Sequence, residues 1–136
     1  MKGEKIKKFI ILVGITVLIL MVVGCSDKTP QYSKFAGENK NWKVILDIQN
    51  PESGSNSKLY TISYIGKKKK PDNISYKIYH ENNKLPTSEG NGSLKNQEEF
   101  SVNEEGKSNP VYKMDIFTVE IKWAKNVEKV SLKYKK

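Results

Sequence analysis

The only cysteine of the chain, Cys25, stands where a run of apolar residues ends and polar sequence begins. Two branched residues and a small one come directly before it: Val22, Val23 and Gly24. A cysteine thiolate is a good nucleophile, and its thioether with an alkyl group is a stable linkage. A small neighbour allows a protease to approach the backbone. Cys25 and the three residues before it are therefore where we expect chemistry in this sequence.

The residues upstream predict an export signal. The first eight residues, MKGEKIKK, carry four lysines and one acid, and an apolar run then extends from Phe9 to Val23. As a helix these 15 residues would span only about 22 Å, short of the roughly 30 Å of a bilayer core. A basic head before a short apolar run is typical of a signal peptide. The alternative is an uncleaved N-terminal anchor in which the cysteine is incidental.

Taken together, Val22-Val23-Gly24-Cys25 resembles a bacterial lipobox. The resemblance implies that a diacylglycerol is attached to the Cys25 sulfur. It also implies that a signal peptidase recognises Val22, Val23 and Gly24 and cleaves between Gly24 and Cys25. One acyl chain holds a protein on a membrane only marginally, whereas two chains anchor the protein stably. We therefore expect a lipoprotein signal peptide over 1–24 and a mature protein anchored to the extracytoplasmic face of the cell membrane.

The remaining residues are enough for one domain. Residues 25–40 are polar and lack a sustained period, so we expect a flexible tether there and the folded domain over 41–136. With Cys25 acylated, no thiol is left for a disulfide, so the domain must be held by packing.

The charge of the chain is basic, with a formal net charge of +9. Without the first 24 residues, 20 lysines and 14 acidic residues leave +6, and arginine is absent. Because base readout depends heavily on arginine, nucleic acid is a poor candidate partner. An anionic surface or polymer suits this charge better.

Apolar and polar residues alternate with a period of two in six runs after the tether: 41–50, 59–65, 73–80, 99–102, 115–123 and 127–134. Such alternation predicts half-buried strands, and turn residues separate the runs. A seventh strand is expected near 93–96 or 111–114. The pattern predicts an all-β, antiparallel β-sandwich of about seven strands, with Trp42 and Trp123 packed between its sheets and a tight hairpin at 124–126.

Three segments resemble small membrane-anchored lipoproteins of Bacillus-like Gram-positive bacteria. These are FAGENKNWKV near the mature start, which fits a GE-x-x-NW pattern, KPDNISYKIY in the middle, and VEIKW before the last hairpin. The resemblance implies an immunoglobulin-like sandwich on a lipid tether, in a group of largely unknown function.

Neither a catalytic nor a metal-binding motif stands out. His80, the only histidine, ends a predicted strand beside Glu81 and is interpreted as a surface residue. One histidine without a free cysteine does not supply the usual zinc ligands. The acidic pairs Glu98-Glu99 and Glu104-Glu105 lack a calcium-loop pattern and are interpreted as solvated charge. We therefore expect no enzyme activity, no cofactor and no metal.

The run Lys67, Lys68, Lys69 and Lys70 is a candidate contact for an anionic surface, with a solvated hairpin tip as the alternative. Two functions follow from these patterns. The first is a monomeric, non-enzymatic binding module whose partner is an envelope protein or an anionic wall polymer. The second is a self-protection (immunity) lipoprotein that sequesters an antimicrobial peptide at the membrane.

Overall fold

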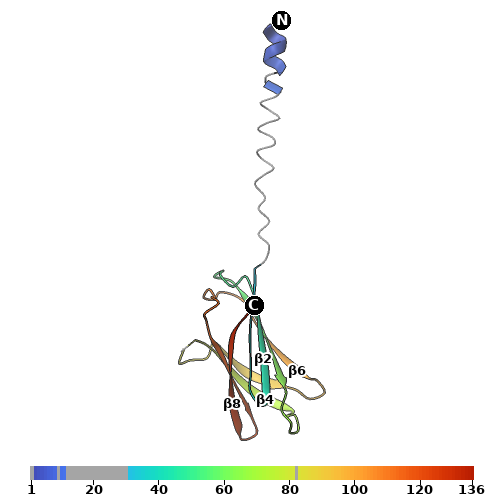
Figure 1. Cartoon of the computed structure of the whole chain (residues 1–136), viewed down its shortest axis with the longest axis vertical. Coiled ribbons are helices and arrows are strands. Elements are labelled where there is room, and N and C mark those ends of the chain that lie inside the picture. Colours follow the sequence, from blue (N-terminus) through green and yellow to red (C-terminus); the bar gives the residue numbers. More distant parts are fainter. Residues whose placement is uncertain (1, 9, 12–30, 82) are drawn as a thin grey trace.

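The computed structural model describes residues 2–8, 10–11, 31–81 and 83–136 (Figure 1). Residues 2–8 and 10–11 are helical, and no helix within the described ranges has the length and apolarity to span a membrane. The predicted signal-peptidase residues Val22, Val23 and Gly24 and the predicted acylation site Cys25 lie outside the described residues, so those predictions stay as they are.

Beyond Gln31 the chain is all-β, and every strand pairing is antiparallel, as the alternation predicted. Eight strands are present among the described residues instead of about seven. They are β1 (Tyr32–Glu38), β2 (Trp42–Gln49), β3 (Ser57–Tyr64), β4 (Asn73–His80), β5 (Ser88–Ser93), β6 (Glu99–Glu104), β7 (Phe117–Trp123) and β8 (Asn126–Lys135).

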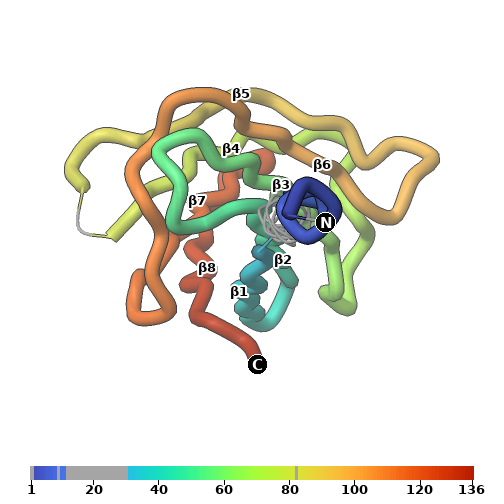
Figure 2. The backbone as a smooth tube through the Cα atoms, turned by 90° about the horizontal axis from the view of Figure 1, so that it is seen from above, coloured from blue at the N-terminus to red at the C-terminus, as the bar shows by residue number. Residues whose placement is uncertain are grey.

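The strands follow the order β5-β4-β7-β8-β1-β2-β3-β6. One layer consists of β5, β4, β7 and the first part of β8, and the other of the end of β8 with β1, β2, β3 and β6. Strand β8 joins the two layers, because residues 126–132 pair with β7 while residues 133–135 pair with β1. In the view from above in Figure 2, the sheet curls round until its two outer strands, β5 and β6, lie next to each other. The result is a sandwich that is closed on the β8–β1 side and has a seam between β5 and β6.

The core lies between the two layers. Its largest fully buried side chains are Trp42, Tyr60, Phe35, Phe117, Leu46, Ile48, Ile62, Ile78, Leu94, Ile121, Leu132 and Val44. Both tryptophans were predicted to pack between the sheets, and the rings of Trp42 on β2 and Trp123 on β7 pack edge to face with centroids 5.2 Å apart. Trp42 is fully buried, whereas Trp123 is half-buried. Burial of this apolar surface is the main force that holds a domain without disulfides together.

Two features of the strand prediction were wrong. The range predicted as a tether, 25–40, contains β1, which pairs with β2 on one side and β8 on the other. The extra strand near the middle of the chain is β5 at 88–93, and neither 93–96 nor 111–114 forms a separate strand. The domain therefore begins near Tyr32 and not at Asn41.

The loops gather at two opposite ends of the sandwich. At the first, called the N-terminal end, Tyr32 of β1 pairs with Gln49 of β2, which pairs with Ser57 of β3. The chain enters the domain here (Figure 1). The opposite, far end carries the two-residue hairpin between Trp123 and Asn126, which confirms the predicted turn at 124–126.

Candidate functional site

The seam between β5 and β6 is tight at the far end. There the Phe100 ring of β6 packs so closely on Gly92 of β5 that a Cβ at residue 92 would lie 2.7 Å from the ring. The same ring lies 5.8 Å from that of Tyr76 on β4. The two strands are joined by a short loop at this end, with Leu94 buried beneath it. The far half of the seam is therefore filled with apolar side chains.

Toward the N-terminal end, polar side chains take over along the seam and enclose a pocket of about 630 Å³. We call it the seam pocket. It lies among the start of β3, the end of β4, the start of β5 and the end of β6. Its lining consists of Asn56, Lys58, His80, Asn83, Thr87, Ser88, Asn103, Glu104, Glu105, Lys107, Ser108 and Asn109.

A cationic and an anionic side chain lie next to each other in the lining of this pocket. Lys58 of β3 and Glu104 of β6 are direct partners in the antiparallel register, and Lys58 is only 8 % exposed. Burial lowers the pKa of Lys58, and the nearby Glu104 carboxylate opposes this shift. Burial likewise raises the pKa of Glu104, and the charge of Lys58 offsets only part of it. Burial thus disfavours the charged form of both groups.

Several buried polar atoms near the pocket have no hydrogen-bond partner among the described residues. They are Oδ1 of Asn56, the hydroxyl of Tyr60, Oε1 of Glu104 and Oγ of Ser108. Asn56 is 3 % exposed, and its Nδ2 donates to the carbonyl oxygen of Asn109 at 3.1 Å. Its side chain is therefore held in place while its oxygen remains unpartnered. Buried polar atoms of this kind cost free energy unless water or a ligand satisfies them.

His80 lines the seam pocket and is also the centre of a second arrangement. Its Nε2 lies 3.1 Å from Oδ2 of Asp115, and its ring stacks on that of Phe117 with centroids 4.5 Å apart. The side chain is only 13 % exposed, so the interpretation of His80 as a surface residue was wrong. The ring is buried because the last residue of β4 pairs with Phe117, the first of β7, which brings the residues before β7 alongside.

Asp115 is buried and holds the turn that precedes β7. Its Oδ2 accepts a hydrogen bond from the backbone N–H of Tyr112 at 2.9 Å. Burial acts to raise the pKa of Asp115, but hydrogen bonds from the Tyr112 N–H, the His80 ring and the Glu81 side chain outweigh it, and the pKa is held below its usual value. Asp115 is therefore a carboxylate at neutral pH.

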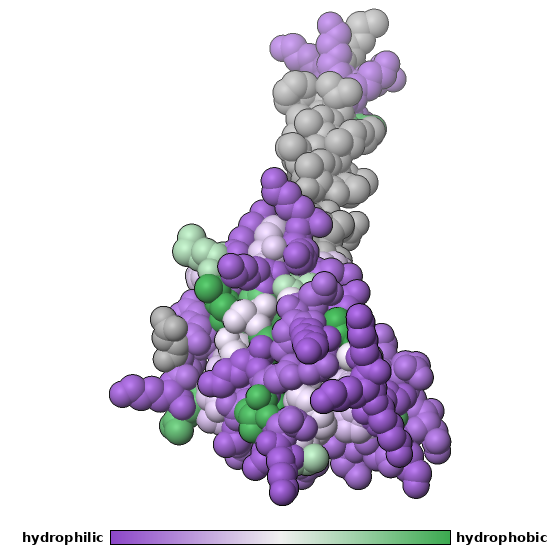
Figure 3. Space-filling view, turned by 60° about the horizontal axis from the view of Figure 1, so that its bottom comes forward, coloured by the Kyte–Doolittle hydropathy of each residue, from purple (hydrophilic) through white to green (hydrophobic). Residues whose placement is uncertain are grey.

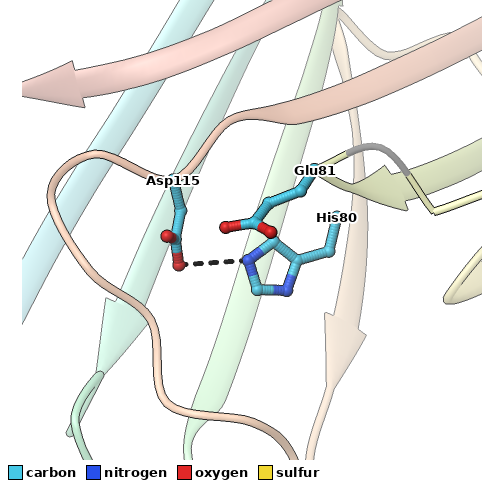
Figure 4. A group of neighbouring side chains, drawn as sticks. All are labelled: His80, Glu81 and Asp115. Carbon is cyan, nitrogen blue, oxygen red and sulfur yellow. Dashed lines mark hydrogen bonds and ion pairs between the residues drawn. The ribbon is translucent and has the colours of Figure 1, made fainter.

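Glu81 completes the arrangement (Figure 4). Its carboxylate points toward the other two side chains, and the ligand atoms of His80, Glu81 and Asp115 all lie within 4.8 Å of one another. The backbone N–H of Glu81 donates to the carbonyl oxygen of Ile116 at 2.6 Å, so the residue is fastened to the segment that carries Asp115. We call these three side chains the His80 cluster.

The lysine run does not lie in this region. Residues 67–70 belong to the connection from β3 to β4, which crosses from one layer to the other at the far end, and not to a hairpin between paired strands. Lys67, Lys68 and Lys69 are exposed. Lys70 is half-buried, and its Nζ donates to the carbonyl oxygen of Gln97 at 2.6 Å. Only three of the four lysines are therefore presented to solvent.

The predicted acidic pairs also separate in the structure. Glu98 is exposed and pairs with Lys70 at 3.3 Å, while Glu99 is exposed on β6. Glu104 is half-buried in the seam pocket, so its interpretation as solvated loop charge was wrong, whereas Glu105 is exposed at the pocket's rim. The signal that could have found Glu104 is its position in β6: it follows Phe100 and Val102 at the same period of two and so faces inward.

No protein-family model matches the chain, and neither a curated protein nor a solved structure is detectably similar to it.

Proposed function

We propose that this protein is a lipid-anchored binding module on the extracytoplasmic face of the cell membrane, non-enzymatic, with the seam pocket as its ligand site. The anchor part of the proposal comes from the sequence Val22-Val23-Gly24-Cys25 and its basic, apolar leader. The relation to Bacillus-like lipoproteins rests on the three segments that resemble them. The immunity alternative stays a prediction, and no feature of the described residues favours it.

The side chains at the N-terminal end suit a surface close to a membrane. Tyr32, Tyr112 and Met114 line one shallow hollow together with Gln31, where the chain enters the domain. The exposed fraction is 69 % for Tyr32, 55 % for Tyr112 and 86 % for Met114. Tyrosine is enriched at the headgroup level of membranes. The exposed Met114 side chain is apolar and is compatible with the same position. This supports a domain held with its N-terminal end toward the bilayer.

In that orientation Lys67, Lys68 and Lys69 point away from the lipid. An eight-residue strand such as β3 spans about 26 Å, and charge interactions are screened over about 8 Å at physiological salt. Lysines at the far end would hardly sense the headgroups. The far end, which comes forward in Figure 3, is mostly hydrophilic with small scattered hydrophobic patches. We therefore assign the lysines to an anionic wall polymer and not to the membrane.

The observation that carries the binding function is that two opposite charges, Lys58 and Glu104, lie side by side in the lining of the seam pocket, with Lys58 only 8 % exposed. A ligand with a carboxylate and an ammonium group would neutralise both, and its polar atoms would reach the unpartnered Oδ1 of Asn56. A pocket of about 630 Å³ accommodates a small molecule. The ligand class that fits is a small zwitterion, such as an amino acid or a short peptide with free termini.

The test uses the full-length chain purified in detergent, with isothermal titration calorimetry as the readout and alanyl-alanine as the probe. We expect saturable binding that is weakened at least tenfold by Lys58→Met, since one buried charge partner is lost. The matched control is Lys43→Met, which removes an exposed lysine of β2 and should bind like the parent. N-acetyl-alanyl-alanine amide, which lacks both charges, should not bind. Equal binding by the parent and Lys58→Met, or no binding at all, would contradict the proposal.

A further inference from the structure

We propose that the His80 cluster is a binding site for a divalent transition-metal ion of the zinc type, with Nε2 of His80 and the carboxylates of Glu81 and Asp115 as its protein ligands. The inference does not rest on the zwitterion site: the two sites share His80, which lines the seam pocket, but Lys58 and Glu104 are not among the metal ligands.

The spacing of the donor atoms fits a common ion. Two ligands at about 2.1 Å from one zinc ion are about 3.0 to 3.4 Å apart for angles of 90–110°. Nε2 of His80 and Oδ2 of Asp115 are 3.1 Å apart, so this pair already has the required separation. All three donors lie within 4.8 Å, and Glu81 is exposed, so its carboxylate can close the remaining distance by turning its side chain.

The kinds of donor restrict the ion. Mg²⁺ and Ca²⁺ prefer oxygen ligands alone, whereas an imidazole nitrogen beside carboxylate oxygens suits Zn²⁺ and its neighbours. The sequence predicted no zinc site, because it offers one histidine and no free cysteine near it. The structure removes that objection, because two carboxylates from Glu81 and Asp115 complete a three-ligand set. Three protein ligands leave a fourth position for water or an exogenous ligand.

The electrostatics of the cluster also favour a cation. Glu81 and Asp115 turn their carboxyl groups toward each other (Figure 4), so two groups of anionic ligand oxygens converge on one point, where a cation would take the place of the hydrogen bond between them. Asp115 is buried, so water would screen its attraction to a bound cation only weakly. His80 is held against Phe117, and the Glu81 backbone is bonded to Ile116, so the ligands are largely in place before an ion binds.

The alternative is that the His80–Asp115 contact is only a buried hydrogen bond that steadies the turn before β7. The two readings differ in what they require of Glu81: a metal site needs its carboxylate as a ligand, whereas a structural contact needs only its hydrogen bond to Asp115, which an amide can also make. Glu81→Gln is therefore the informative variant, because it should leave the fold intact and remove one metal ligand.

The experiment uses the full-length chain with Cys25→Ser, without a polyhistidine tag, in detergent and stripped of metal by a chelator. Zn²⁺ is titrated by calorimetry, and Co²⁺ is titrated with visible absorption as the readout of its coordination. We expect one Zn²⁺ per chain and Co²⁺ bands of a four- or five-coordinate site. Glu81→Gln should weaken Zn²⁺ binding about tenfold or more, and His80→Asn should remove saturable binding. Glu89→Gln, which changes an exposed carboxylate on β5, should bind like the parent.

Melting curves without metal show whether each variant is folded, and Zn²⁺ should raise the melting temperature of the parent but not that of His80→Asn. No saturable Zn²⁺ binding by the parent would overturn the proposal. So would binding of unchanged strength in both Glu81→Gln and His80→Asn. If His80→Asn does not fold, Glu81→Gln and the Co²⁺ spectrum of the parent decide the question.

Discussion

Phe35 of β1 packs edge to face on Phe117 of β7, with ring centroids 5.2 Å apart, and so joins the first strand of the domain to the opposite layer of the sandwich. Phe35 is fully buried, and β1 supplies the hydrogen-bonding partner for both β2 and β8. Residues that the sequence analysis assigned to a tether are therefore part of the core.

This contact predicts where the domain can be cut. A chain of residues 31–136 should give a β-type circular dichroism spectrum and a cooperative melt, because it retains all eight strands. A chain of residues 39–136 loses Phe35 and exposes the edges of β2 and β8, so it should not melt cooperatively. Removing a buried phenylalanine side chain alone costs about 3–5 kcal/mol, a large part of a small domain's stability. Equal melting of the two chains would show that β1 is not part of the cooperative unit.

The two tryptophans should differ in their contribution to stability. Trp42 is fully buried and Trp123 half-buried, although their rings touch. We expect Trp42→Ala to lower the free energy of unfolding by about 3–5 kcal/mol and Trp123→Ala by about half as much. Trp42→Phe should cost less than Trp42→Ala, because it keeps a ring and removes an indole N–H that has no partner among the described residues. Denaturant titrations measure all three, and a larger loss for Trp123→Ala would contradict the packing.

Most strands could be predicted from the sequence because β2, β3, β4, β7 and β8 each bury one face and expose the other. β1 was missed because Phe35 is its only fully buried side chain. β5, with the sequence SEGNGS, has no apolar residue at all and is a strand because β4 pairs with it. In both, tertiary pairing and not local pattern decides the conformation.

The candidate site could be predicted only in part. The sequence shows His80 next to Glu81, but Asp115 is 35 residues away from His80. Its position follows from the pairing of β4 with β7, a register that alternation does not specify. The partnership of Lys58 with Glu104 depends in the same way on β6 pairing with β3 instead of with β5, its neighbour in the chain.

Glu104 predicts a dependence of stability on pH. Its pKa in the folded protein is raised above the ordinary 4.5, so the folded state binds this proton more tightly than the unfolded state does. Above the raised pKa, the charged carboxylate destabilises the fold, and this cost disappears as the pH falls through the raised value toward 4.5. Glu104→Gln should therefore melt at a higher temperature than the parent at neutral pH, with a difference that shrinks on acidification.

Melting curves between about pH 4.5 and 8 measure this effect. Glu99→Gln, at an exposed position of the same strand, is the matched control and should show no such trend. A Glu104→Gln variant that melts lower than the parent at neutral pH would mean that the attraction to Lys58 outweighs the burial of the carboxylate.

The exposed lysines at the far end predict a weak, salt-sensitive interaction. The parent should bind teichoic acid at low salt and lose most of that binding at about 0.5 M salt, where screening is strong. Changing Lys67, Lys68 and Lys69 to serine should remove most of it without lowering the melting temperature, since Lys70 and its contact with Gln97 are kept. Sedimentation with the polymer measures binding.

The matched control changes an equal number of exposed lysines away from the far end, Lys84, Lys133 and Lys135, to serine. If the control variant loses as much binding as the far-end variant, net charge and not the far-end loop is responsible, and the assignment to this loop is wrong.

The central claim is that a lipid on Cys25 anchors this binding domain. The most direct measurement is the intact mass of the protein recovered from the membrane fraction of a Gram-positive host, with Cys25→Ala as the comparison. We predict a mature chain that begins at Cys25 and carries the added mass of a diacylglyceryl group, and for Cys25→Ala an unprocessed chain without lipid. A parent protein of unmodified, full-length mass, or a Cys25→Ala variant that is processed and retained in the membrane like the parent, would contradict the account.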